Sequence, residues 1–111
     1  QGELAELLSP WQPALLQMVQ AACEGGRATG KQIGVCGEAG GDPVLALVLT
    51  GLGVTSLSMA PSKVNVVRAA LRLHDFATCQ QMAAYALDAR TAKDAKDAVT
   101  AIVHPTLLDL L

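Results

Sequence analysis

Aromatic residues are scarce in this 111-residue chain, which contains one Trp, one Tyr and one Phe. A core with so few aromatic rings must be built from Leu, Val and Ala, and that composition favours helices and buried strands. The formal net charge of -2 gives no electrostatic reason to expect nucleic acid or an acidic membrane as a partner. Small molecules and proteins remain as candidate partners.

The cysteines lack the spacing of a metal site. Cys23, Cys36 and Cys79 lie far apart and form neither a CxxC pair nor a pattern with histidine. Three thiols cannot all pair with one another, so a reducing cytoplasm fits best. Gly and Pro interrupt every apolar segment, and no cationic leader precedes one. The chain is therefore predicted to be cytoplasmic, without membrane insertion.

The length allows one domain with a single core. Neither an internal repeat nor a low-complexity linker divides the chain, so we treat residues 1–111 as one unit. The sequence starts at Gln1 and runs at once into apolar Leu4, Leu7 and Leu8. This pattern predicts a beginning cut from a longer chain.

A helix is predicted near the start of the sequence. Ser9 followed by Pro10 is a helix-start signal, because Ser can cap free backbone amides and Pro fits the first turn. Apolar residues then recur at intervals of three and four up to Cys23, and Gly25-Gly26 is the predicted end.

Two βα units follow this helix. Residues 32–36 are short, apolar and partly β-branched, which predicts a buried parallel strand ending at Cys36. A glycine-rich turn leads to Asp42, the predicted cap of a helix that Pro43 opens. A second strand at 54–59 and a further helix directly after it repeat the pattern. The order is βαβα.

Beyond His74 the pattern predicts helices alone. Asp75 is the predicted cap of one, and Thr91, with an acidic residue three positions later, of the next. The charged run 93–97 is best explained as a solvated helical face. Pro105 then precedes an apolar tail, which we expect to dock on the body or on another subunit.

Cys36 stands where α/β folds place catalytic groups, at the carboxyl end of a predicted parallel strand. Free amides in residues 37–41 and the amino terminus of the helix capped by Asp42 can face a phosphate or a carboxylate. The alternative is that Cys36 is a buried structural thiol, the commonest state of a lone cysteine. Position and spacing alone leave both interpretations open.

The residues around Cys36 also carry a family resemblance. VCGEAGGDP, residues 35–43, closely resembles the cysteine signature of phosphoenolpyruvate (PEP)-utilising enzymes. That family includes enzyme I of the sugar phosphotransferase system, pyruvate phosphate dikinase and PEP synthase. GLGVTSLSM, residues 51–59, and AAYALDA, residues 83–89, are similar to the end of enzyme I and less similar to the dikinases.

This resemblance implies an α/β fold. The family carries the cysteine on a late strand of a (β/α)8 TIM barrel, so the chain would supply the last two βα units plus carboxyl-terminal helices, mostly helical by residue count. A complete barrel needs eight strands and roughly 250 residues, so this one is incomplete. Unpaired strands and one-sided helices need cover, which predicts self-association, and the parent family is dimeric.

The resemblance also implies an activity. Enzyme I transfers the phosphoryl group of PEP to its own histidine and then to the carrier protein HPr, releasing pyruvate, with Mg²⁺ as the required ion. The cysteine that matches Cys36 donates a proton to the enolate carbon, so Cys36 is the predicted catalytic residue.

Other parts of the family's site have no counterpart in this sequence. The Mg²⁺ ligands, the phosphate-binding arginines and the phosphohistidine of the family would lie upstream, so the chain alone is predicted to be inactive. His74 and His104 are predicted to be surface or capping residues, and Arg68 and Arg72 to be solvated. If the parent is another enzyme of this family, the alternatives are pyruvate phosphate dikinase and PEP synthase. If the chain is not part of an enzyme, the alternative is a small helical interaction module in which Cys36 is buried.

Overall fold

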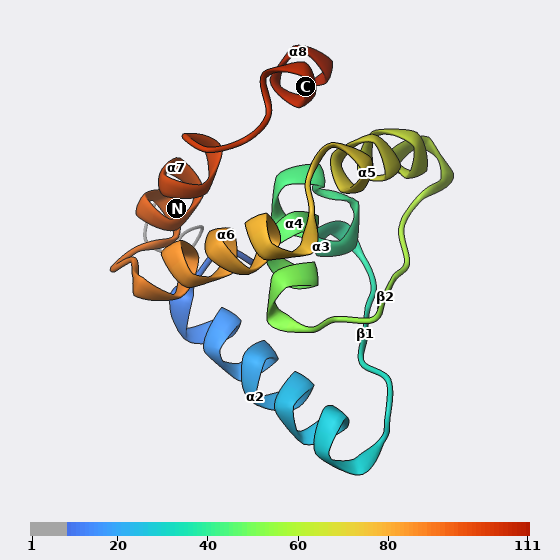
Figure 1. Ribbon diagram of the computed structural model, residues 1–111, viewed down its shortest axis with the longest axis vertical. Coiled ribbons are helices and arrows are strands. Elements are labelled where there is room, and N and C mark those ends of the chain that lie inside the picture. Colours follow the sequence, from blue (N-terminus) through green and yellow to red (C-terminus); the bar gives the residue numbers. More distant parts are fainter. Residues whose placement is uncertain (1–8) are drawn as a thin grey trace.

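A computed structural model describes residues 9–111, which form a mostly helical body with one small sheet (Figure 1). The predicted order of strands and helices is confirmed, with two unpredicted short helices added at 38–41 and 105–110. Leu4, Leu7 and Leu8 lie outside the described residues. In chain order the elements are α2 (Pro13–Thr29), β1 (Gly34–Val35), α3 (Glu38–Gly41), α4 (Pro43–Leu52), β2 (Ser56–Leu57), α5 (Pro61–Leu73), α6 (Phe76–Asp88), α7 (Ala92–Thr100) and α8 (Pro105–Leu110).

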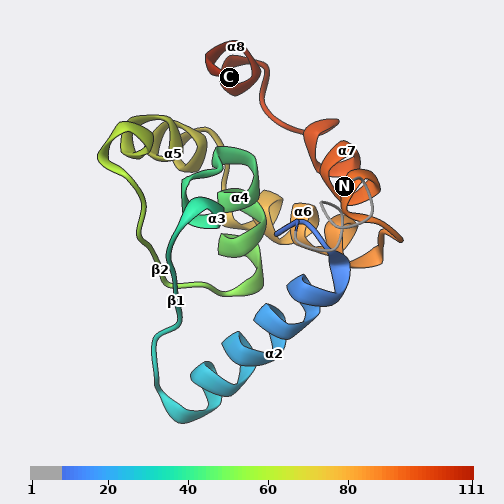
Figure 2. The same cartoon turned by 180° about the vertical axis from the view of Figure 1, so that it is seen from behind.

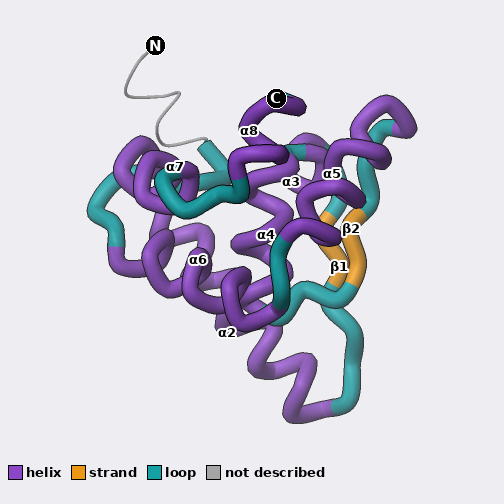
Figure 3. The backbone as a smooth tube through the Cα atoms, turned by 45° about the horizontal axis from the view of Figure 1, so that its top comes forward, coloured by secondary structure: helices purple, strands orange, loops and turns teal. Residues whose placement is uncertain are grey.

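The sheet consists of β1 and β2, which run parallel (Figure 3). Gly34 is the partner of Ser56, and Val35 is the partner of Leu57. The parallel pairing predicted from the sequence is therefore confirmed, and α4 is the helix that connects the two strands.

Both strands are shorter than the predicted runs 32–36 and 54–59. Next to the sheet, a side chain adds to the backbone bond from the N–H of Thr55 to the carbonyl of Ile33: the backbone N–H of Ile33 donates to the hydroxyl oxygen of Thr55 over 3.0 Å. The same hydroxyl donates to the carbonyl oxygen of Ile33, also over 3.0 Å. The two chains thus stay joined at this point although the regular strand pairing has ended.

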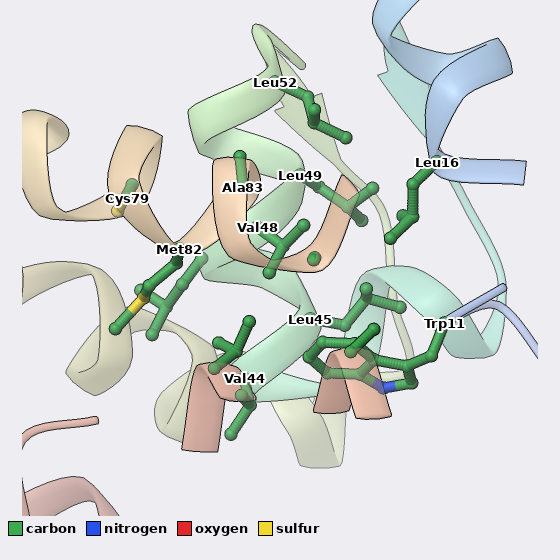
Figure 4. Close-up of a cluster of buried hydrophobic side chains, with 14 of the residues drawn as sticks. Trp11, Leu16, Val44, Leu45, Val48, Leu49, Leu52, Cys79, Met82 and Ala83 are labelled. Atoms are coloured by element: carbon green, nitrogen blue, oxygen red, sulfur yellow. The ribbon is translucent and has the colours of Figure 1, made fainter. Parts of the chain in front are cut away.

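Helix α4 is the centre of the core. Residues 44–49 are all buried, which is the expected position for a helix that is apolar on every side. Helices α2, α5, α6 and α7 all contact it. Figure 4 shows its side chains between Trp11 and Leu16 on one side and Met82 and Ala83 of α6 on the other. Because α4 begins soon after Cys36, this core also anchors the chain around the cysteine.

The start of the first helix differs from the prediction. Helix α2 begins at Pro13 rather than just after Ser9. The hydroxyl oxygen of Ser9 accepts a hydrogen bond from the backbone N–H of Trp11 over 3.2 Å, which makes a local turn before the helix. Ser9 therefore caps this turn rather than the helix. The indole of Trp11, which belongs to the turn, lies in the core and is 4% exposed.

The predicted end of this helix was wrong. Helix α2 continues through Gly25-Gly26 and ends at Gly30, which adopts the left-handed conformation with φ of 71°. Glycine inside a helix costs about 1 kcal/mol relative to alanine, so it does not by itself stop one. At Gly26 a side chain is excluded, because a Cβ atom would lie 2.8 Å from the backbone carbonyl oxygen of Lys31 and 2.9 Å from Ile33 Cγ1.

The carboxyl-terminal helices follow the prediction. The carboxylate of Asp75 accepts from the N–H of Thr78, and the hydroxyl of Thr91 accepts from the N–H of Asp94, so both predicted caps are confirmed. The charged run is a solvated face, with an exposed 2.6 Å ion pair between Lys93 and Asp97. No helix within residues 9–111 is long and apolar enough to cross a membrane.

Both histidines are caps, as predicted, and they bond to each other. His104 precedes α8, where its Nδ1 accepts from the N–H of Thr106 over 3.0 Å. The backbone N–H of His104 donates to Nε2 of His74 over 3.0 Å, so Nδ1 of His74 is the nitrogen that donates to the carbonyl of Ala70. This linkage places α8 on α5, where Leu107 is buried. The apolar tail thus docks on the body through Leu107 alone, while Leu108, Leu110 and Leu111 are exposed.

Gly51 lies at the contact between α4 and α6. A Cβ atom at this position would overlap the carbonyl oxygen of Cys79. Gly51→Ala is therefore expected to lower the free energy of unfolding by about 3 kcal/mol, because the two helices must move apart. Urea denaturation followed by circular dichroism measures the change.

Gly25→Ala is the matched control, since a Cβ atom at Gly25 would have nothing within 4 Å. This substitution in the exposed face of α2 is expected to raise the free energy of unfolding by about 0.5–1 kcal/mol. A Gly51→Ala variant as stable as the parent chain would contradict the close approach of α4 and α6.

Candidate functional site

Cys36 follows β1 directly and is exposed. The alternative of a buried structural thiol is therefore wrong. The two cysteines that are buried are Cys23 and Cys79, 3% and 2% exposed. Burial raises the pKa of both thiols, which keeps them protonated and unreactive.

The two faces of the sheet differ in what they contact. Val35 and Leu57 are partly buried and pack against the core. Side chains alternate across a strand, so their neighbours point to the opposite face. We call that side of the sheet the open face; its four residues are exposed, and they are Gly34, Cys36, Ser56 and Ser58. Figure 2 shows the strand pair at the edge of the body, next to α4.

The turn after Cys36 is more regular than the predicted glycine-rich loop, because residues 38–41 form the single-turn helix α3. Gly37 joins the strand to this turn with φ of 85° and ψ of -158°, a conformation that favours glycine. A Cβ atom at Gly40 would lie 2.7 Å from the carbonyl oxygen of Ser58. Close packing against the end of β2 therefore fixes the turn and, with it, the position of Cys36.

Asp42 ends this turn and begins α4, as predicted. Its Oδ1 accepts from the backbone N–H groups of Val44 and Leu45, over 3.0 and 3.1 Å. Its Oδ2 accepts from the indole N–H of Trp11 over 3.1 Å. The expectation that the amino terminus of this helix faces a phosphate or a carboxylate is wrong for these two amides, because the protein's own carboxylate occupies them.

A cavity of about 880 Å³ opens beside the turn, and Gly37, the residue after Cys36, is part of its wall. Its lining is mainly apolar, with Met59 among the contributors, and two basic side chains reach it, Lys63 from α5 and Lys96 from α7. Such a cavity has the size of a small-molecule site. Sequence reasoning missed both lysines, because each lies on an ordinary exposed helical face and no spacing links them.

Arg68 and Arg72 are exposed, as predicted. Arg68 also lines a second hollow of about 630 Å³ between β2 and α5, together with Thr55 and Leu57. Arg72 lies in the last turn of α5, where a cation is favourable for the helix dipole.

Among the side chains that the structure describes, those near Cys36 do not fit a magnesium site. Magnesium prefers carboxylate oxygens in an octahedral arrangement. Asp42 supplies a carboxylate, but both of its oxygens accept hydrogen bonds from the chain itself. Across the part of the chain that the structure describes, no three His, Cys, Asp or Glu side chains gather into a cluster that can hold a metal.

Comparison with known proteins identifies the family. The sequence profile described as "PEP-utilising enzyme, PEP-binding domain" matches residues 1–76. The chain belongs to this family. It is 49% identical over 102 residues to a phosphoenolpyruvate-protein phosphotransferase of Streptomyces coelicolor, a match that covers 92% of this chain. The resemblance read from residues 35–43 is thus confirmed.

More distant relatives carry related names. A multiphosphoryl transfer protein of Xanthomonas campestris is 39% identical over 85% of this chain. A phosphoenolpyruvate-protein phosphotransferase of Mycoplasma pneumoniae is 33% identical over 84% of it. The chain spans 18%, 11% and 16% of the length of these three relatives, in the order given.

The exposure of the three thiols predicts how they react. In the folded chain, Ellman's reagent is expected to modify Cys36 rapidly. Cys23 and Cys79 should react on the order of 100-fold more slowly, since they become accessible only when the structure opens. The absorbance of the released thiolate should rise by one equivalent at first and by three after unfolding in urea. In Cys36→Ser the rapid equivalent should vanish; its persistence would contradict the assignment.

Proposed function

We propose that this chain is the carboxyl-terminal part of an enzyme I, a PEP-protein phosphotransferase, and that Cys36 donates the proton that converts enolpyruvate to pyruvate. The observation that carries the proposal is the exposed position of Cys36 at the carboxyl end of β1. Family membership and the identity to a named phosphotransferase support it.

The proposed step is a proton transfer to carbon. When the phosphoryl group of PEP leaves for the histidine of the enzyme, the enolate of pyruvate remains. Its C3 takes the proton from Sγ of Cys36, a C–H bond forms as the S–H bond breaks, and water later returns a proton to the thiolate. A donor held against one face of the planar enolate speeds such a transfer by roughly 10²–10⁴-fold.

The sheet supports a place for this chain in a (β/α)8 barrel. In such barrels helices cover the outside of the sheet, and catalytic groups stand at the carboxyl ends of the strands. Here Val35 and Leu57 face the helices, while Cys36 lies on the open face at a carboxyl end. We assign β1 and β2 to the last two barrel strands, whose outer edges would pair with the remaining six.

The rest of the site would come from outside this chain. Enzyme I needs Mg²⁺, a phosphohistidine and the carrier protein HPr, and the described residues offer no fitting carboxylates near Cys36. A cytoplasmic homo-oligomer is the proposed form of the full enzyme, because the family that the chain resembles is dimeric. The named relatives above are phosphotransferases, which favours this activity over a dikinase or a PEP synthase. The exposure of Cys36 counts against the alternative of a small helical module in which this cysteine is buried.

Cys36→Ala in the full-length enzyme is expected to lower kcat for pyruvate formation by about 100-fold or more, because no other group replaces the proton donor. A lactate dehydrogenase-coupled assay measures the release of pyruvate. Cys23→Ala removes a buried thiol of α2 instead and should leave kcat within about twofold of the parent. An unchanged rate in Cys36→Ala would rule out the proton-donor role.

The isolated 111-residue chain is expected to release no pyruvate from PEP in the presence of Mg²⁺ and HPr. The reason is that neither the phosphate-binding groups nor the phosphohistidine of the family belongs to it. The same coupled assay applies, with the full-length enzyme as positive control. Turnover by the chain alone would show that it holds a complete site and would overturn this assignment.

A further inference from the structure

Trp11 and Asp42 connect two distant parts of the chain. The indole N–H of Trp11 donates to Oδ2 of Asp42 over 3.1 Å, across 31 positions in the sequence. Trp11 is 4% exposed, and Figure 4 shows its ring against α4 beside Leu45. An indole buried this deeply needs an acceptor for its N–H, and Asp42 is that acceptor.

The hydrogen bond from Trp11 to Asp42 is not needed to cap α4. One carboxylate oxygen is sufficient to cap a helix, as Asp75 shows at α6, where Oδ1 accepts from the N–H of Thr78. Asp42 caps α4 with Oδ1 alone and uses Oδ2 for Trp11. The second oxygen thus ties the start of α4 to the segment that enters α2.

The same carboxylate stands at one end of the turn that carries Cys36. At the other end, the backbone N–H of Ser58 donates to the carbonyl of Val35 over 2.9 Å and holds the strand. Between the two ends lie only Cys36, Gly37 and the single turn α3. Because the turn is this short, a shift of Asp42 must also shift Cys36.

We infer that the hydrogen bond between Trp11 and Asp42 positions Cys36 for proton transfer. It fixes the turn that carries the thiol relative to the segment before α2. The catalytic part of this inference rests on the proposed function, in which the substrate-binding groups precede Trp11 in the sequence. Trp11 and Asp42 act as positioning residues, since both oxygens of Asp42 accept hydrogen bonds from the chain itself.

Three variants of the full-length enzyme test the inference. Trp11→Phe keeps an aromatic ring in the core and removes the donor. Asp42→Asn keeps an oxygen that can cap α4, but its amide nitrogen cannot accept from the indole. The third variant combines both changes. Asp75→Asn is the matched control, the same substitution at a cap that bonds to Thr78 and not to a tryptophan.

Each single variant is expected to lower kcat for pyruvate formation about tenfold with KM within about twofold, since a misplaced proton donor slows the chemical step and leaves binding intact. The double variant should be no slower than the slower single one, because both changes remove the same bond. Asp75→Asn should keep the parent kcat. Additive losses, an unchanged kcat in either single variant, or an equal loss in Asp75→Asn would each overturn the inference.

Amide hydrogen exchange separates this inference from the proposed function. In Trp11→Phe and Asp42→Asn, exchange across residues 36–42 should accelerate about tenfold, while α6 keeps its parent rates. Unchanged exchange in residues 36–42 would overturn the positioning role whatever Cys36 does. A harmless Cys36→Ala together with accelerated exchange would reject the proton-donor role and leave the coupling of Trp11 to the turn standing.

Discussion

The burial of α4 is the constraint on which the rest of the structure depends. The apolar residues of α4 lie on every side of the helix, so a position on the surface would leave some of them exposed to water. The helix is therefore stable only when other helices enclose it. Each buried Leu or Val side chain contributes about 1.5–3 kcal/mol relative to exposure. Helices α2, α5, α6 and α7 provide the enclosure, and their packing fixes both ends of α4.

The geometry around Cys36 follows from this enclosure. Once α4 is fixed, Asp42 at its start is fixed as well, and the single turn α3 leaves Cys36 little freedom. Gly40 of this turn also packs against Ser58 at the end of β2, so the strand holds the turn on its other side. The thiol of Cys36 is thus held by a rigid core although it is itself exposed, which is how binding and catalytic groups are commonly carried.

Local signals were sufficient to predict much of this fold. The caps at Asp42, Asp75 and Thr91 are each made by a side chain and backbone amides two or three residues away, so the sequence around them carries all the information. The parallel strand order also followed from the alternation of strands and helices. Cys36 was found by its motif and by its place after a predicted strand.

Contacts between distant residues explain what the sequence did not reveal. The pair Gly25-Gly26 predicts a helix end, whereas Gly26 lets the Lys31 carbonyl and Ile33 approach the last turn of α2. The bond from Trp11 to Asp42 spans 31 positions, and Lys63 and Lys96 reach one cavity from separate helices. Neither arrangement has a local pattern that would predict it, because tertiary packing alone brings these groups together.

The pairing of Gly34 with Ser56 has a consequence for sequence variation. These two residues are register partners on the open face, directly before the position of Cys36. A Cβ atom at Gly34 would stand 2.7 Å from the hydroxyl oxygen of Ser56, so a larger residue at 34 requires a smaller one at 56. We expect these two positions to covary among homologues, with the summed volume of the pair nearly constant; independent substitution in an alignment would contradict this. The combined size of residues 34 and 56 would then set the depth of the surface beside the Cys36 thiol in each homologue.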